Sequence, residues 1–113
     1  MELTQYIIVN AGLGMNKGKI AAQAAHASVS VLDKVDNELI EEWKESGMKK
    51  IVLKVKDEKE LLELFMRTKI EFPCALITDA GKTQIAPGSK TCFACGPCEE
   101  NKAQKYFAKL KLL

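Results

Sequence analysis

The feature that most constrains how this chain can fold is its alternation of short apolar runs with segments that have helical spacing. The apolar runs are rich in β-branched residues and have the length of buried strands: residues 6–9, 50–55, 74–78 and 91–95. Helical segments separate or follow them at about residues 16–33, 37–46, 58–71 and 99–107. Strands that alternate with helices predict an α/β fold, with an at least partly parallel sheet covered by helices on both faces.

The chain is long enough to bury a core without metal or disulfide support, so residues 1–113 are predicted to form a single domain. No apolar run approaches the length of a membrane span, and the polar Thr4 and Gln5 argue against a signal peptide. We therefore expect a cytoplasmic protein with no membrane partner. In that compartment the four cysteines are expected to be thiols.

The net charge of +2 by itself gives no evidence of nucleic-acid binding. The distribution of charge is more informative, because residues 1–32 and 72–113 together carry eight lysines and four acidic residues. The residues between them carry nine basic and eleven acidic side chains. A basic face is therefore expected if the two ends of the chain meet, with a modest field that salt screens.

The loop after the first predicted strand, which begins at Asn10, leads into an alanine-rich helix with an unusual start. Asn16 is a good N-cap, but Lys17 and Lys19 lie at the positive end of the helix dipole, where acidic side chains are favoured. Gly18 between them lowers the helix propensity. Two ammonium groups and free backbone N–H groups make an anion pocket, and we expect a phosphate there.

Lys19, Gln23, His26 and Ser30 follow one another at helical spacing and form a polar stripe on this helix. The rest of the helix surface is small and apolar, which predicts a helix buried against the sheet with one edge open to water. An amide, an imidazole and a hydroxyl on that edge suit hydrogen bonding inside a cleft. The alternative is that Gln23 and His26 only satisfy neighbouring backbone groups.

Asp79 follows the third predicted strand and begins a loop that contains glycine and several hydroxyl residues. Ligands of α/β sheets bind outside the carboxyl ends of the strands, so parallel first and third strands would bring Asp79 close to Lys19. A lysine and an aspartate that hold a water or a hydroxyl form a workable acid–base unit. The alternative for Asp79 is an Asx turn, in which its carboxylate accepts backbone N–H groups two residues on.

Two glycine motifs are incomplete. Gly12-x-Gly14 lacks the third glycine of a dinucleotide-binding loop. Gly18-Lys19 resembles the end of a P-loop, but the first glycine and the Ser or Thr that binds magnesium are missing. Neither motif predicts a nucleotide site.

A cysteine cluster is the remaining candidate for a metal site. Cys92, Cys95 and Cys98 have a spacing that serves iron–sulfur clusters, and Cys74 could supply a fourth thiolate. Cys92 and Cys95 would point to opposite faces of a strand, however, and cysteine also packs well as a small hydrophobic residue. We therefore expect neither a metal site nor a cofactor.

Several stretches of the chain match one known family in order and spacing. The longest are residues 14–27 (GMNKGKIAAQ-x-x-HA) and 79–88 (DAGKTQIAPG), and residues 49–55 (KKIVLKV) and 109–113 (KLKLL) also match. The chain thereby resembles the peptidyl-tRNA hydrolases of the archaeal and eukaryotic type over nearly its whole length. The resemblance implies hydrolysis of the ester between a peptide, or an N-blocked amino acid, and the 3′-terminal ribose of tRNA, which recycles tRNA from aborted translation. It also implies a mixed four-stranded sheet flanked by helices, peptidyl-tRNA as the partner, and often a homodimer.

The resemblance implies roles for individual residues. Lys19, Asp79 and Thr91 match the positions that the family is thought to use for catalysis. Asp79 would orient or deprotonate a water, directly or through Thr91, while Lys19 stabilises the oxyanion or a nearby phosphate. Alternatively, Thr91 is the attacking hydroxyl, and the sequence leaves both readings open. The other candidate residues of the cleft are Asn10, Lys17, Gly18, Gln23, His26, Gly81, Thr83 and Gln84.

The chain departs from the family pattern in two places. Asn10-Ala11-Gly12 stand where the family usually has Arg, then Asn, Ser or Thr, then Asp, which removes one charge of each sign. The cysteines at 92, 95 and 98 replace residues that are commonly small or apolar, which agrees with a packing role. Two other functions remain open: a non-catalytic tRNA- or protein-binding module, and a phosphate-ester or nucleotide enzyme that uses Lys17 and Lys19.

Overall fold

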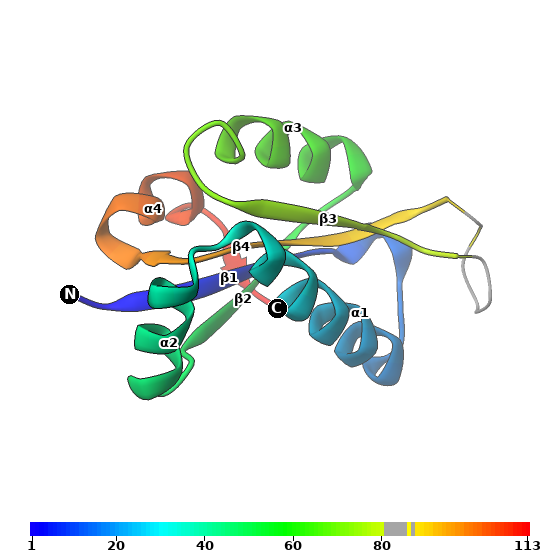
Figure 1. Cartoon of the computed structure of the whole chain (residues 1–113). Coiled ribbons are helices and arrows are strands. Elements are labelled where there is room, and N and C mark those ends of the chain that lie inside the picture. Colours follow the sequence, from blue (N-terminus) through cyan, green and yellow to red (C-terminus); the bar gives the residue numbers. More distant parts are fainter. Residues whose placement is uncertain (81–85, 87) are drawn as a thin grey trace.

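The computed structural model describes residues 1–80, 86 and 88–113, and Figure 1 shows how the elements are arranged. In chain order the elements are β1 (Leu3–Asn10), η1 (Ala11–Leu13), α1 (Lys17–Ser30), η2 (Val31–Lys34), α2 (Asn37–Glu45), β2 (Lys50–Val55), α3 (Glu58–Thr68), β3 (Cys74–Thr78), β4 (Lys90–Glu99), α4 (Glu100–Phe107) and β5 (Lys111–Leu112). β2 and β3 have the bounds that the sequence predicts, whereas β1 is longer than predicted at both ends.

The strands form one mixed sheet in the order β3-β4-β1-β2-β5. β1 and β2 pair in parallel, and β4 pairs antiparallel with both β1 and β3, so β3 runs in the same direction as β1. The carboxyl ends of β1, β2 and β3 therefore share one edge of the sheet, which we call the C-edge. β4 and β5 both begin at the C-edge, because each is antiparallel to its neighbours.

The expectation of a four-stranded sheet is wrong by one strand within the described residues. Lys111–Leu112 pairs with β2 as the short strand β5, and the backbone N–H of Leu113 donates to the carbonyl of Val52 at 3.1 Å. A segment of two paired residues is too short to show the alternation by which a strand is recognised in a sequence. β5 forms because β2 would otherwise be an edge strand whose outer backbone groups have no partner.

Helices cover both faces of the sheet, as predicted (Figure 1). On one face, α3 and α4 contribute Leu61, Leu64, Ala103 and Phe107 to a core that contains Tyr6, Ile8, Phe93 and Cys95 of the strands. On the other face, α1 and η2 contribute Ala27 and Val31 to a core that contains Ile7, Val9, Ala75 and Ala94. α2 lies on the same side of the sheet as α1.

β4 continues through Gly96 and Pro97, where the sequence predicts its end. The register between β1 and β4 shifts at this point, so a β-bulge absorbs the two residues. Gly96 has a φ of 93°, and a Cβ there would lie 2.8 Å from the carbonyl oxygen of Thr4, so the position requires glycine. A bulge also accommodates a proline, which has no N–H for the ladder.

α1 begins as predicted, but its burial differs from the prediction. The N-cap Asn16 accepts the backbone N–H of Lys19 at 2.9 Å. Only Ala27 is fully buried, however, and Ala21, Ala22 and Ala25 on the outer surface are exposed. The prediction of a helix buried except along one edge is therefore wrong, because a single layer of helices covers this face and the outer half of α1 has nothing to pack against.

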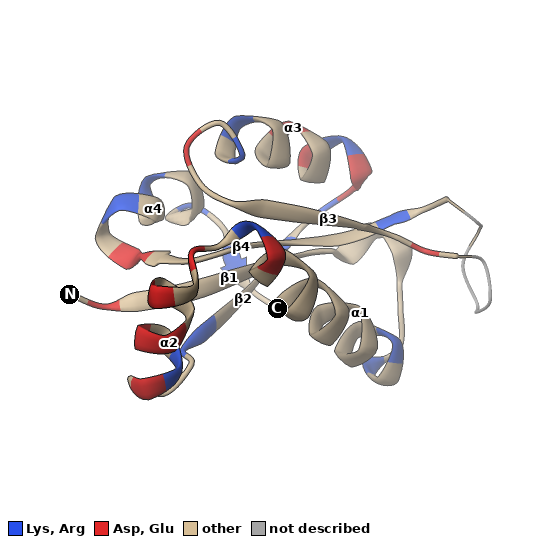
Figure 2. Ribbon diagram, in the orientation of Figure 1, with Lys and Arg blue, Asp and Glu red and all other residues tan. Residues whose placement is uncertain are grey.

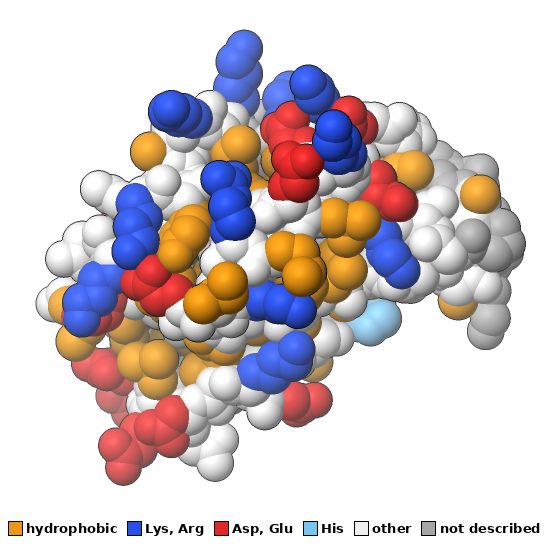
Figure 3. Space-filling view, turned by 90° about the horizontal axis from the view of Figure 1, so that it is seen from above, with side chains coloured by type: hydrophobic (Ala, Val, Ile, Leu, Met, Phe, Trp, Pro, Cys, Tyr) orange, Lys and Arg blue, Asp and Glu red, His pale blue; other side chains and the backbone are white. Residues whose placement is uncertain are grey.

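Charged residues are distributed unevenly over the elements. α1 carries lysines only in its first turn, whereas α2 carries mainly acidic residues (Figure 2). Lysine and arginine side chains are spread over the face seen in Figure 3, next to exposed hydrophobic side chains. Among the described helices, none has the length and apolarity needed to span a bilayer.

Candidate active site

Lys19 and Asp79 form a buried ion pair at the C-edge, in agreement with the predicted closeness of the two residues. Lys19 lies in the first turn of α1, and Asp79 follows β3 directly. The Lys19 Nζ donates to the Asp79 Oδ1, and the two side chains are only 8% and 3% exposed. A charge withdrawn from water to this extent requires an opposite charge beside it, so each side chain depends on the other.

Local backbone structure fixes both partners of the ion pair. The Oδ1 of Asn16 accepts the N–H of Lys19, which sets the first turn of α1. The N–H of Asp79 donates to the carbonyl of Ser89 at 2.8 Å, and the carbonyl of Asp79 accepts the N–H of Gly88 at 3.0 Å. These two bonds close the base of the connection between β3 and β4 and hold the carboxylate at the C-edge.

A second polar pair lies one helical turn further along α1. The hydroxyl of Thr91, which is fully buried, donates to the Oε1 of Gln23 at 2.7 Å. Gln23 is four residues after Lys19 and therefore lies on the same face of α1. Thr91 lies at the start of β4, next to the register pair of Thr78 and Lys90 at the end of β3. The two polar pairs are therefore neighbours at the C-edge.

Asn10, the last residue of β1, connects the strands at this edge. Its Nδ2 donates to the carbonyl of Lys90 at 3.1 Å, and its Oδ1 accepts the N–H of Gly12 at 3.0 Å. The residue is 2% exposed, so its amide is engaged with the backbone and not with solvent. Asn10 thus ties the start of β4, and with it Thr91, to the loop that follows β1.

The remaining candidates do not all join the ion pair. Lys17 and Gly18 are exposed in the first turn of α1, beside Lys19. His26 is also exposed, and no hydrogen bond or ion pair joins its side chain to another described residue. Three further candidates, Gly81, Thr83 and Gln84, lie outside the described residues.

The four cysteines are buried free thiols. Cys92 belongs to the core beneath α1, whereas Cys74, Cys95 and Cys98 belong to the core on the opposite face, as the alternation along β4 predicts for Cys92 and Cys95. Burial raises the pKa of the Cys92 thiol to about 11. Within the part of the chain that the structure describes, no group of three or more His, Cys, Asp or Glu residues could hold a metal ion.

Two side chains that the sequence patterns do not mark fix the elements around the site: Gln5 at the far end of β1 from the ion pair, and Glu58 beside Thr91. Gln5 is fully buried in β1, where its Nε2 donates to the carbonyls of Ser28 and Gly96 and its Oε1 accepts the Ser28 hydroxyl at 2.5 Å. Glu58 accepts the N–H of Lys90 at 3.2 Å, next to Thr91. A glutamine next to an apolar run was the available signal for the first contact, and no local pattern marks the second.

Comparisons with known proteins agree with the resemblance. A family model described as peptidyl-tRNA hydrolase PTH2 matches residues 3–113. The chain is 48% identical over 113 residues to a peptidyl-tRNA hydrolase of Methanococcus maripaludis strain C7, with 96% of this chain and 97% of that protein covered. It is 40% identical over 111 residues to the peptidyl-tRNA hydrolase of Methanocaldococcus jannaschii, with 95% of this chain and 96% of that protein covered.

A eukaryotic protein is similar as well. The mitochondrial peptidyl-tRNA hydrolase 2 of Bos taurus is 41% identical over 115 residues, which cover 98% of this chain and 64% of that protein. These matches extend over all the elements that carry the buried ion pair and the Thr91–Gln23 hydrogen bond. On this evidence the chain belongs to the peptidyl-tRNA hydrolase PTH2 family.

Proposed function

We propose that this protein hydrolyses the ester bond that joins a peptide, or an N-blocked amino acid, to the 3′-terminal ribose of tRNA. The observation that carries the proposal is the buried Lys19–Asp79 ion pair at the C-edge, beside the hydrogen-bonded Thr91 and Gln23. Membership of the family supports the substrate class, since the similar proteins are named for this activity.

Asp79 accepts the proton of the attacking water in this proposal. A carboxylate oxygen has more than one lone pair, so Asp79 can accept a hydrogen bond from water while it remains paired with Lys19. The water oxygen attacks the ester carbonyl carbon as its proton passes to Asp79. The bond to the ribose oxygen then breaks, and that oxygen takes the proton that Asp79 removed from the water, which returns Asp79 to its carboxylate form.

Lys19 supplies positive charge where negative charge develops. Its ammonium group has three donors, and the contact with Asp79 uses one of them. Another donor can bind the oxyanion that the carbonyl oxygen becomes in the tetrahedral intermediate. Because the ion pair is withdrawn from water, the interaction with the oxyanion is stronger than it would be on an exposed surface.

Water, and not the Thr91 hydroxyl, is the nucleophile in this proposal. The Oγ1 of Thr91 donates to the amide oxygen of Gln23 at 2.7 Å, and its other contacts are the Ile77 carbonyl at 3.4 Å and the Cys92 Sγ at 3.8 Å. None of these groups is a base that removes a proton from a threonine hydroxyl. Thr91 and Gln23 act as positioning residues, because their hydrogen bond fixes α1 to β4 and so orients the ion pair.

The substrate also requires contacts to the RNA. Lys17 is exposed in the first turn of α1, where an ammonium group and the helix N-terminus suit a phosphate near the 3′ end. The single domain over residues 1–113, the cytoplasmic location and the homodimer remain predictions.

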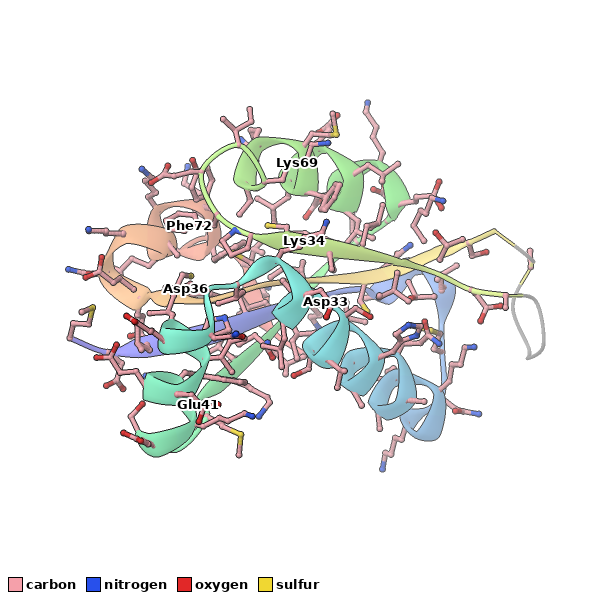
Figure 4. All side chains as sticks on the ribbon, in the orientation of Figure 1. Asp33, Lys34, Asp36, Glu41, Lys69 and Phe72 are labelled. Carbon is pink, nitrogen blue, oxygen red and sulfur yellow. The ribbon has the colours of Figure 1, made fainter. Side chains whose placement is uncertain are left out.

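The experiment that tests this function uses tRNA charged with a labelled N-acetyl-amino acid. The wild-type protein is expected to release the label, and Asp79→Asn is expected to slow release by about 10²- to 10⁴-fold. Glu41→Gln is the matched control, because Glu41 lies in an exposed ion pair with Lys44 on α2 (Figure 4). Binding of tRNA without release by wild type would favour the non-catalytic module, and turnover of small phosphate esters alone would favour the nucleotide enzyme.

A further inference from the structure

A second basic site lies at the C-edge, on the other side of β1 from the ion pair. It is a groove with a volume of about 460 Å³ between the end of β2 and the start of β5. Four lysines line the groove: Lys54, Lys56, Lys109 and Lys111. Among the described residues, Glu60 is the one acidic residue in its lining. We call this site the lysine groove.

The lysines of the groove have no partners that compensate their charge. All four are exposed, and within the described residues no ion pair or side-chain hydrogen bond involves any of them. Five other lysines of the described chain are paired, since Lys19, Lys44, Lys49, Lys102 and Lys105 each contact a carboxylate. The positive charge of the groove is therefore available to a ligand.

The register of the sheet brings two of these lysines face to face. Lys54 of β2 lies directly opposite Lys111 of β5 in the antiparallel pair. Side chains in such positions share a face with their Cβ atoms about 4.5–5.5 Å apart, and like charges there are destabilising. Lys56 is two residues after Lys54, and Lys109 is two residues before Lys111, so both lie beside this pair at the C-edge. A local rule broken in this way is expected where a ligand of opposite charge binds.

The lysine groove and the ion pair share one edge of the sheet. Asp79 follows β3, and β2 and β5 are three and four strands away from β3 in the sheet order. At about 4.8 Å per strand, the groove lies about 14–19 Å from the ion pair. One strand of a nucleic acid rises about 3.4 Å per phosphate, so this separation corresponds to roughly four to six nucleotides.

We infer that the lysine groove binds the phosphate backbone of tRNA where the single-stranded 3′ end joins the acceptor stem. The identity of the RNA rests on the proposed function, which places the ester at the ion pair. Lysine ammonium groups are flexible point charges that suit phosphates, and contacts to phosphates position a nucleic acid without reading its sequence. The groove therefore contributes affinity and register, and it does not select one tRNA over another.

The test compares two variants that remove the same amount of charge. Lys54→Gln/Lys111→Gln alters the lysine groove. Lys44→Gln/Lys69→Gln is the control. Lys44 lies in the last turn of α2, which leads to the start of β2, and Lys69 (labelled in Figure 4) caps the end of α3, which leads to the start of β3; both strands begin opposite the C-edge. Binding of uncharged tRNA is measured by fluorescence anisotropy between about 50 and 200 mM salt.

The groove variant is expected to bind tRNA about tenfold more weakly than wild type at about 0.1 M salt. The slope of log Kd against log salt concentration is expected to fall by about 2, because two phosphate contacts are lost. The control variant is expected to keep the wild-type slope. Equal slopes for the groove variant and the control would overturn the inference.

Thermal melting separates a binding role from a structural one. Removal of two opposed ammonium groups is expected to leave the Tm of Lys54→Gln/Lys111→Gln unchanged or higher. A lower Tm would show that the lysines serve the fold and would count against the inference.

The binding measurement is independent of turnover, so the two proposals fail separately. If tRNA binding depended on the groove lysines but the wild-type protein released no N-acetyl-amino acid, the proposed function would be overturned and the inference about the groove would still hold. If the groove variant and wild type released the N-acetyl-amino acid equally fast at low concentrations of full-length N-acetyl-aminoacyl-tRNA, only the inference about the lysine groove would be overturned. We expect the groove variant to have a raised KM for full-length N-acetyl-aminoacyl-tRNA. Its KM for an N-acetyl-aminoacyl trinucleotide, which lacks the stem phosphates, is expected to change less.

Discussion

Lys19 and Asp79, 60 positions apart in the chain, form an ion pair in which the side chains are 8% and 3% exposed. The topology of the sheet produces this contact, because α1 follows β1 and Asp79 follows β3, and both strands end at the C-edge. Withdrawing two charges from water is unfavourable unless each compensates the other. The pair therefore links the stability of this edge to the chemistry proposed there.

Breaking the ion pair from one side is expected to destabilise the protein. Lys19→Met or Asp79→Asn alone leaves one uncompensated buried charge and is expected to lower the free energy of unfolding by about 3–5 kcal/mol. The double variant Lys19→Met/Asp79→Asn removes both charges and is expected to recover much of this loss. Urea unfolding measures all three. Single variants as stable as wild type would mean that the pair is open to water in solution.

The N-cap of α1 is expected to affect catalysis as well as stability. Asn16→Ala removes the cap of the turn that carries Lys19 and is expected to lower stability by about 1 kcal/mol and to reduce kcat. Asp57→Ala is the matched control, because Asp57 caps α3 through the N–H of Glu60 at the same distance of 2.9 Å. It is expected to lower stability similarly without a loss of kcat. If the two variants changed kcat equally, the Asn16 cap would have no specific role in orienting Lys19.

Thr91→Val is expected to slow hydrolysis without abolishing it. The variant loses the hydrogen bond to Gln23 and shifts the ion pair, which is expected to reduce kcat by roughly tenfold to hundredfold. Thr68→Val serves as the control, since Thr68 is equally buried and donates to the Leu64 carbonyl at 2.7 Å, away from the site. Loss by about 10⁶-fold, or a burst of acyl-enzyme in wild type, would identify Thr91 as the nucleophile instead.

Stability is expected to fall at alkaline pH. Burial raises the pKa of Cys92 from 9.0 to about 11 and that of Tyr6 from 10.0 to about 12. Between these values the unfolded chain loses protons that the folded chain retains, so stability is complete below about pH 9 and declines as the pH rises toward 12. Unfolding measured across this range is expected to show a shallower decline for Tyr6→Phe. An unchanged decline in that variant would mean that Tyr6 ionises normally in the fold.

Periodic patterns predicted most of the fold, and long-range pairing accounts for the rest. β2 and β3 were predicted with their observed bounds because each is an apolar run closed by polar or helix-starting residues. The predicted end of β4 is wrong because Gly96-Pro97 usually stops a strand, whereas here a bulge against β1 accommodates the two residues. The sequence does not predict the exposure of α1, because alanine alone does not show whether a second layer covers a helix.

The candidate site divides in the same way. The closeness of Lys19 and Asp79 followed from a general rule about the carboxyl ends of parallel strands. The hydrogen bond between Gln23 and Thr91 could not be predicted from spacing, since it depends on where α1 crosses β4. The lysine groove also cannot be predicted from the sequence. Nothing marks the lysines of β2 and of the C-terminal tail as special, and only the register between β2 and β5 brings Lys54 and Lys111 together.

The most direct test of the account is a double-mutant cycle at the ion pair, measured as the single-turnover rate of release from N-acetyl-aminoacyl-tRNA. Residues that act as one catalytic unit have strongly non-additive effects. Lys19→Met and Asp79→Asn are each expected to slow release by about 10²-fold or more, and the double variant is expected to be no slower than the slower single variant. The exposed pair Glu41→Gln/Lys44→Met is expected to match wild type. Losses at Lys19 and Asp79 that multiply in the double variant, or single variants that retain the wild-type rate, would contradict the account.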